Sequence, residues 1–380
     1  QLVYPHDFRL TEKEKTSICY LSFPDSYSGG LGDTQFSFRL RQAGGSRASP
    51  FQDDGRYNRE APLTLQREAA HYFGYVYFRQ VKDSSMRRGY FQKSLVLVSR
   101  LPYVNLFQCL LQLIAPEYFD KLEPCLEAAH YPIPLSHYPI PLSHYPIPSL
   151  LPLQVRIPSR VDKPGSSPVR QCNQENLLPA PLVLPSVHEL DLFRCFQPVL
   201  IHIQMLWELM LLGEPMVVMA PSPTVSSEMV LALTSCLAPL RYCCDFRPYF
   251  TIHDSEFKEY TTRTQAPEGS WGCSEGGHGR GWVTQVQSPK EGTEPEVSPC
   301  VPSPGTGDLP KQVKVKKLAK LKTLDTKPGI YTSYKTFLHK DKTLIKRLLK
   351  GIQRKRPSEV QSALLRRHLL ELTQSFIIPL

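Results

Sequence analysis

The sequence predicts an α/β fold, and the stretch 190–246 gives the clearest pattern. Apolar residues in 198–212 recur at helical spacing, and the Gly-Glu-Pro that follows is a typical helix stop. A segment dense in Val and Met, 216–220, lies between prolines and predicts a buried strand. A serine pair and a glutamate then predict the start of a second apolar helix, 226–237. Helix, buried strand, tight turn and helix are typical of an α/β core.

The region before residue 129 predicts a strand meander backed by helices. Residues 34–40 alternate cleanly between apolar and polar side chains, which is typical of a half-buried strand. The spacing between the last two strand-like segments predicts a hairpin. Four segments have strand-like patterns: 17–23, 34–40, 72–81 and 90–99. Two helices are expected next, 103–114 and 116–128, the second with Pro at its first position, where a missing amide costs nothing.

Residues 130–150 consist of three copies of a seven-residue repeat, the third with its last two residues exchanged. A period of seven is typical of a coiled coil, but two prolines in each repeat exclude a helix, so we expect extended, polyproline-like chain. The repeat is either a ligand for an SH3- or WW-type domain or a spliced, duplicated or mispredicted insert. Residues 151–187 continue as a Pro-rich linker that contains one expected strand, 153–157.

Beyond the second helix of the core, two short strands are expected at 241–244 and 249–252. The composition then changes, because residues 267–307 hold nine of the 21 glycines and two of the three tryptophans without any periodicity. Such a composition buries too little apolar surface to offset the entropy of ordering. We therefore expect residues 267–307 to be a disordered insert without a core strand.

Positive charge is concentrated at the end of the chain. Residues 308–380 carry 18 Lys and Arg against 5 Asp and Glu, whereas 1–307 carry 27 against 30. An amphipathic helix is expected at 341–356, with a basic face, and a capping box at Ser358 predicts a further helix, 359–374. The basic face could contact anionic lipid, nucleic acid or an acidic protein surface, or it is simply solvated.

Sequence motifs for covalent chemistry are missing. The chain has no phosphate loop, no dinucleotide fingerprint, no nucleophile elbow and no metal-ligand spacing, so neither a cofactor nor a metal is expected. Ten cysteines without a Cys-x-x-Cys pair predict buried, reduced thiols, for example Cys109, Cys195 and Cys236. No uninterrupted apolar run of about 18 residues occurs, so a membrane-spanning helix is not expected.

Several motifs resemble a known family. The Leu-Leu-Gly-Glu-Pro at 211–215, with the following strand and the Ala-Pro-Ser-Pro at 220–223, resembles the central module of DENN domains. Three flanking motifs resemble the sixth subgroup of that family: Leu-Val-Tyr-Pro at 2–5, Tyr-Phe-Gly-Tyr-Val-Tyr-Phe-Arg at 72–79 and Ile-Ala-Pro-Glu-Tyr-Phe at 114–119. The resemblance covers most of 1–129, 151–266 and 308–380.

The resemblance implies how the chain is divided. The implied parts are a longin-like upstream module at 1–129, a Pro-rich repeat and linker at 130–187, a central DENN core at 188–266, an insert at 267–307 and the truncated start of a helical downstream part at 308–380. At the insert the family carries an apolar core strand. Losing a central strand would cost more than the roughly 5–15 kcal/mol that stabilise a domain.

The resemblance also implies a function. DENN domains are guanine-nucleotide exchange factors for Rab GTPases, so we expect a non-enzymatic, cofactor-free regulator in the cytoplasm that is recruited to recycling endosomes. Expected partners are a Rab GTPase and an anionic membrane, without nucleic acid. The candidate partner-binding residues are Lys346, Arg347 and Lys350 on the basic helix. The alternatives are a Rab-binding adaptor, a basic lipid- or nucleic-acid-binding protein that uses 311–356, or a non-functional splice isoform lacking a core strand.

Overall fold

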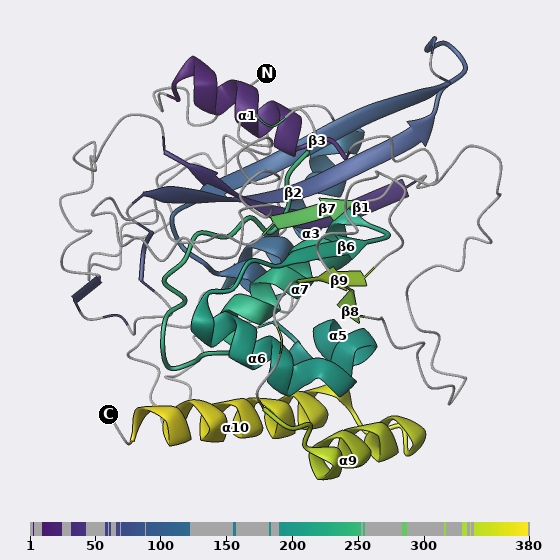
Figure 1. Cartoon of the computed structure of the whole chain (residues 1–380). Helices are drawn as coiled ribbons and strands as arrows, with labels where there is room; N and C mark the ends of the chain where they lie inside the picture. Colours follow the sequence, from purple (N-terminus) through teal and green to yellow (C-terminus); the bar gives the residue numbers. More distant parts are fainter. Residues whose placement is uncertain are drawn as a thin grey trace, which may run out of the picture.

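The computed structural model describes five stretches of the chain, some with short gaps: 10–24, 32–42, 66–121, 190–251 and 329–378. It also describes a few single residues and four short strands at 155–156, 182–183, 283–286 and 315–316. The repeat at 130–150 and most of the insert at 267–307 lie outside the described residues. In the described part, helices combine with two larger sheets, which confirms the α/β class (Figure 1).

The first lobe is a three-stranded antiparallel sheet between two helices. The sheet order is β1 (Gly32–Arg41), β2 (His71–Lys82) and β3 (Tyr90–Ser99). The strands expected at 34–40, 72–81 and 90–99 are confirmed, and β2 and β3 form the expected hairpin. Helix α1 (Glu12–Leu21) covers the face with Phe36 and Phe78, and α3 (Val104–Lys121) covers the face with Tyr75. Each face of the sheet therefore belongs to a different apolar cluster.

Two expectations for this lobe are wrong. Most of segment 17–23 belongs to α1 and not to a strand, because Thr11 and Glu14 form a capping box: the Glu14 amide donates to Thr11 Oγ1 at 3.2 Å and the Thr11 amide to Glu14 Oε2 at 2.8 Å. The two helices expected around residue 115 are one helix, α3, which passes through Pro116. An internal Pro removes one helical hydrogen bond, and here the buried Leu111 and Ala115 keep the helix on the sheet.

The second lobe begins with the helical stretch that the sequence singled out. It consists of α5 (Leu192–Phe196), a 3₁₀ helix η3 (Gln197–His202) and α6 (Ile203–Leu212), which ends at Gly213 in the left-handed conformation at φ 64°. Strand β6 (Val217–Ala220) and α7 (Pro223–Ser235) follow. Helix α7 begins earlier than expected, because Ser222 and not Ser226 is its cap: Ser222 Oγ accepts from the Val225 amide at 3.3 Å.

Strand β6 lies inside a four-stranded sheet of order β7-β6-β9-β8. It pairs in parallel with β7 (Val283–Val286) and antiparallel with β9 (Gly329–Tyr331), which in turn pairs with β8 (Val315–Lys316). The expectation that 267–307 contains no core strand is therefore wrong. Val-Thr-Gln-Val at 283–286 has high β-propensity, but the Gly- and Pro-rich sequence around it hides so short a signal.

Smaller strand predictions had mixed outcomes. The strand expected at 153–157 is confirmed in part as β4 (Val155–Arg156), which pairs with β5 (Leu182–Val183). The strands expected at 241–244 and 249–252 are wrong for the described residues, because 241–251 forms only an isolated bridge at Phe246. Its aromatic side chains are buried between the lobes, so side-chain packing and not sheet pairing explains their apolar character.

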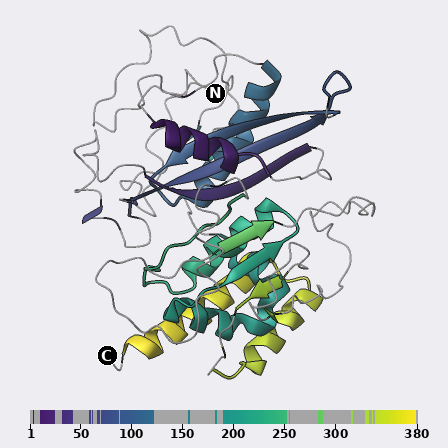
Figure 2. The same ribbon diagram turned by 45° about the horizontal axis from the view of Figure 1, so that its top comes forward.

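Two helices, α9 (Lys342–Gln353) and α10 (Ser358–Ile377), form the outer layer of the second lobe (Figures 1 and 2). Asp341 caps α9 by accepting from the Thr343 and Leu344 amides. The capping box expected at Ser358 is wrong, because Ser358 and Ser362 both donate to Asp191, the cap of α5. A tertiary contact thus replaces the local cap and fixes α10 against the start of the second lobe.

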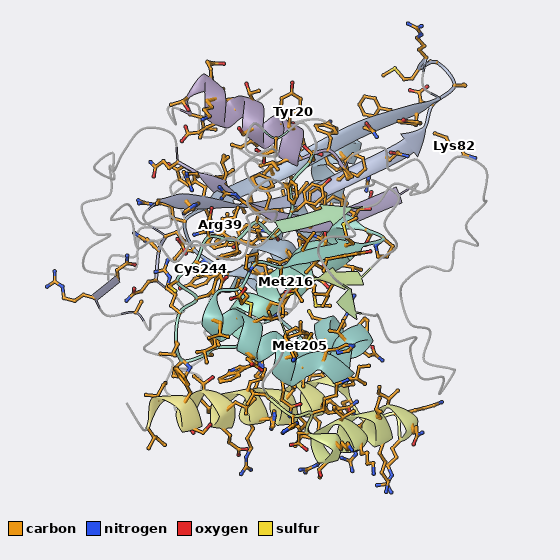
Figure 3. All side chains as sticks on the ribbon, in the orientation of Figure 1. Tyr20, Arg39, Lys82, Met205, Met216 and Cys244 are labelled. Carbon is orange, nitrogen blue, oxygen red and sulfur yellow. The ribbon has the colours of Figure 1, made fainter. Side chains whose placement is uncertain are left out.

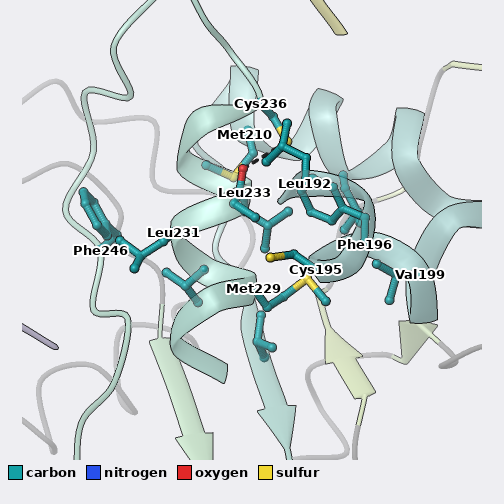
Figure 4. Close-up of a cluster of buried hydrophobic side chains, with 14 of the residues drawn as sticks. Leu192, Cys195, Phe196, Val199, Met210, Met229, Leu231, Leu233, Cys236 and Phe246 are labelled. Atoms are coloured by element: carbon teal, nitrogen blue, oxygen red, sulfur yellow. Dashed lines mark hydrogen bonds between the residues drawn. The ribbon is translucent and has the colours of Figure 1, made fainter. Parts of the chain in front are cut away.

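The core of the second lobe consists of apolar side chains from α5, α6 and α7 (Figure 4). The free thiols of Cys195 and Cys236 are buried there, as predicted, but the expectation of burial is wrong for Cys109, which is half-buried, and for Cys243, which is exposed. By length and composition alone Leu192–Leu212 could span a membrane, which the residue pattern did not predict. Most of this stretch is buried within the protein, and the core helix of a globular domain passes the same test.

One glycine in the first sheet is required by packing. Gly74 pairs with Phe38 across β1 and β2, and a Cβ added at Gly74 would lie 2.1 Å from Phe38 Cζ. We predict that Gly74→Ala lowers the free energy of unfolding by about 1–3 kcal/mol, the usual cost of overpacking, as measured by urea denaturation. In a Phe38→Leu background the same substitution should cost clearly less. Equal costs in both backgrounds would contradict this explanation.

Candidate functional site

The two lobes meet where the edge of the first sheet contacts α7. Strand β1 is an edge strand, so its outward backbone groups need partners outside the sheet. The Ser37 amide donates to Ser227 Oγ at 3.3 Å, and Thr224 Oγ1 donates to the Gln35 carbonyl at 2.7 Å. Side-chain hydroxyls of α7 thus take the place of a neighbouring strand. This explains why polar residues are buried in an otherwise apolar helix.

Beside this contact lies a cluster of titratable side chains, buried at Arg39 and Arg247 and more exposed toward Arg41 and Arg241. We call it the seam cluster: Arg39, Arg41, Glu68, His71, Arg241, Asp245 and Arg247. Arg39, only 6% exposed, donates to Asp245 Oδ1 at 2.6 Å and to Glu68 Oε2 at 3.2 Å. Its guanidinium also lies 4.3 Å from the centre of the Phe246 ring. Arg39 therefore connects β1 of the first lobe with the 241–251 segment of the second (Figure 3).

The protonation states of the seam cluster follow from its geometry. Burial alone would raise the pKa of Asp245, but the guanidinium groups of Arg247 and Arg39 outweigh it and lower the pKa below its ordinary value. Burial, together with the positive charges of Arg39 and Arg247, lowers the pKa of His71 to about 3. The ring of His71 is therefore neutral at physiological pH, and its Nδ1 accepts from Arg39 at 3.0 Å. Near neutral pH, Asp245 therefore stays ionised and His71 stays neutral.

A pocket of about 590 Å³ opens next to the seam cluster and is lined by both lobes. Its walls are mainly apolar and include Phe73 of β2, Leu231 of α7 and Leu369 of α10. Glu68 and Arg241 form an ion pair at the pocket, with Nη2 and Oε1 2.6 Å apart. The Cys236 thiol also lines it, but burial raises the pKa of that thiol, so it is not a ready nucleophile. A pocket with such walls is better suited to bind an apolar group than to react with one.

The structure places the candidate residues Lys346, Arg347 and Lys350 together on the exposed face of α9. Helix α9 lies in the outer layer of the second lobe, away from the first sheet (Figure 1). The seam cluster was missed by sequence analysis because its partners are far apart in the chain: Arg39 and Asp245 are separated by 206 positions. In the sequence Arg39 falls on the polar side of an alternating strand, which gives no sign of burial.

Among the residues that the structure describes, no group of three or more His, Cys, Asp or Glu could hold a metal ion. The buried charges of the seam cluster are already paired with one another.

Comparison with known proteins identifies the family. No family model matches the chain. Over its whole length the chain is 68% identical to Protein DENND6B of Homo sapiens and 55% identical to Protein DENND6A of Gallus gallus. Over 97% of its length it is 30% identical to Protein DENND6 homolog of Dictyostelium discoideum. The chain belongs to the DENND6 group of DENN-domain proteins. It spans 64% of the length of the first two relatives and 57% of the third.

In this DENND6 chain, removing the central carboxylate of the seam cluster should be costly. We predict that Asp245→Asn lowers the free energy of unfolding by about 3–5 kcal/mol, because the buried guanidinium groups of Arg39 and Arg247 would both lose a carboxylate and Arg39 would keep only Glu68. The same substitution at Asp33, which pairs with Arg79 at the surface with Oδ1 and Nε 2.7 Å apart, should cost about 1 kcal/mol or less. Denaturant unfolding of both variants measures the difference. Similar losses in the free energy of unfolding would show that the seam cluster contributes little to stability.

The neutral His71 predicts how stability depends on pH. As pH falls below about 6.5, the unfolded chain binds a proton at this position that the folded chain, with a pKa of about 3, cannot bind. Stability should therefore fall by about 1.4 kcal/mol more per pH unit between pH 6 and 4 than in His71→Gln. Urea denaturation at several pH values measures both slopes. The control is the same substitution at exposed His339, which should keep the steeper slope.

Proposed function

We propose that this chain is part of a guanine-nucleotide exchange factor that promotes GDP release from a Rab-family GTPase in endosomal membrane traffic. The observation that carries the proposal is the whole-chain similarity to DENND6 proteins, at 68% and 55% identity. In this proposal 1–129 is the longin-like module, 188–266 the central DENN core, and 308–380 the start of the helical third part. The protein would be cytoplasmic and recruited to recycling endosomes.

An exchange factor of this kind makes and breaks no covalent bond. It lowers the barrier to nucleotide release because it contacts the nucleotide-free GTPase more strongly than the GDP-bound form. An acceleration of about tenfold requires only about 1.4 kcal/mol of such differential binding. The described part of the chain suits this mode of action, since its buried charges are paired and its two lobes meet in a well-packed contact.

The seam cluster gives the proposal a physical basis. A surface assembled from two lobes can favour one GTPase conformation only if the lobes keep a fixed relative position, because flexible surfaces lose binding free energy on ordering. Two ion pairs join the lobes, Arg39 with Asp245 and Arg241 with Glu68, each with an N···O distance of 2.6 Å. The seam cluster would thus act by positioning and would not itself contact the GTPase.

The second candidate is an adaptor that binds a Rab GTPase without releasing its nucleotide. The chain covers less than two thirds of the DENND6 relatives, and a piece that binds need not exchange. A non-functional splice isoform was the third alternative at the sequence level. Its premise, the loss of the strand beside β6, does not hold because β7 pairs there.

The test is release of fluorescent GDP from a panel of Rab GTPases in the presence of the full chain. We predict that the chain accelerates release from one Rab, and that Asp33→Asn keeps this activity, because Asp33 is a surface residue of β1 with a single ion pair. Circular dichroism verifies that each preparation is folded. A folded chain that binds a GDP-loaded Rab without accelerating release would contradict the proposal and support the adaptor.

A further inference from the structure

The outer face of α9 carries a concentration of positive charge with no acidic residue. Between residues 342 and 356 the chain has seven Lys and Arg and not one Asp or Glu. All seven side chains are exposed: Lys342, Lys346, Arg347, Lys350, Arg354, Lys355 and Arg356. We call this set the α9 cations. Within the described part of the chain, none of the α9 cations forms an ion pair.

Helical geometry places these charges on one side. At about 100° per residue, the five α9 cations from Lys342 to Arg354 fall within an arc of about 140°. The opposite side is buried, with Ile345 and Leu348 in the core and Gly351 in close contact with α10, where an added Cβ would lie 2.1 Å from Gln361 Oε1. Packing against α10 therefore fixes the rotation of α9 and turns its cations outward.

Stability of the helix does not explain this charge distribution. Cations near a helix C-terminus interact favourably with the helix dipole, which accounts for Lys350 and Arg354. Lys342 occupies the first turn of α9, where the dipole disfavours a cation. Repulsion between neighbouring like charges also opposes folding. A ligand that is itself negative would remove both disadvantages.

Lys355 adds an independent observation. Its φ of 50° lies in the left-handed region, and it is the one residue other than glycine with a positive φ among those described. The amides of Lys355 and Arg356 close α9 by donating to the carbonyls of Ile352 and Gly351, a position where glycine is the usual residue. A side chain at this position carries a steric cost that glycine avoids. Backbone strain that persists is often associated with function.

We propose that the α9 cations dock on a membrane surface rich in anionic lipid. A flat row of Lys and Arg complements a surface of many separate negative headgroups, and each such residue near the surface strengthens binding about fivefold. Single-stranded nucleic acid fits less well, because its binding relies on exposed aromatic side chains, and α9 has none. The apolar residues of α9 pack against the core of the protein and do not face the membrane. Attachment of the chain to the membrane is therefore electrostatic and peripheral. This inference does not rest on exchange activity.

The test is co-sedimentation of the full chain with phosphatidylcholine vesicles, with and without phosphatidylserine, at low and at physiological salt. We expect binding only when phosphatidylserine is present, and weaker binding as salt increases. Combined Lys346→Gln, Arg347→Gln and Lys350→Gln substitutions should weaken it about 100-fold. The matched control is Lys13→Gln, Lys82→Gln and Arg87→Gln, which removes the same charge from exposed positions in the first lobe. Figure 3 labels Lys82 among them. The control should change binding less than about twofold.

A second variant separates binding from folding. Lys355→Gly should raise the thermal midpoint, because it relieves the left-handed strain, while it weakens vesicle binding about fivefold. Equal losses in the α9 and control triple variants would overturn the proposal, as would a failure to bind phosphatidylserine vesicles at low salt. Tighter binding to single-stranded DNA than to vesicles would assign the α9 cations to nucleic acid instead.

Discussion

The ion pair between Arg39 and Asp245 is the contact on which the arrangement of the described lobes depends. Arg39 belongs to an edge strand of the first sheet, and Asp245 belongs to the irregular segment that follows the central helices of the second lobe. Each residue also has a partner in its own lobe, Glu68 for Arg39 and Arg247 for Asp245, but the 2.6 Å pair between the lobes is the shorter one for both. The hydroxyls of α7 that bind the backbone of β1 also join the lobes, through neutral hydrogen bonds. Polar groups, rather than apolar area alone, thus define how the lobes meet.

The proposed exchange factor would need its two lobes to keep a fixed relative position. Such a protein acts through surfaces whose relative positions must be preserved while a partner changes shape. The seam cluster preserves those positions, and its low-pKa members, Asp245 and His71, keep a constant charge near neutral pH. The basic face of α9 lies in the outer layer of the second lobe (Figure 1). Attachment through α9 would leave the first lobe free for a protein partner.

The parts of the fold that were predictable from sequence depend on local patterns. Alternation identified β1, strand-like composition and hairpin spacing identified β2 and β3, and the Gly-Glu-Pro stop located the end of α6. The candidate residues Lys346, Arg347 and Lys350 were found because a helical basic face is also a local pattern. Helix α1 is the exception, because the apolar segment 17–23 resembles a strand while the capping box of Thr11 and Glu14, which starts the helix, lies before that segment. Strand β7 was missed because four residues within Gly-rich sequence give almost no periodic signal.

The seam cluster was not predictable, for a physical reason. Its ion pairs form only when the fold brings residues 39, 68, 71 and 241–247 together. A single sequence does not show which distant residues are in contact. Native-state hydrogen exchange tests most directly whether this contact makes the lobes one cooperative unit. Backbone amides of β1 and of α7 should then exchange with the same opening free energy, and Asp245→Asn should lower both equally. If β1 exchanged through a separate, lower-energy opening while α7 stayed protected, the lobes would be independent and the central role of the ion pair would be contradicted.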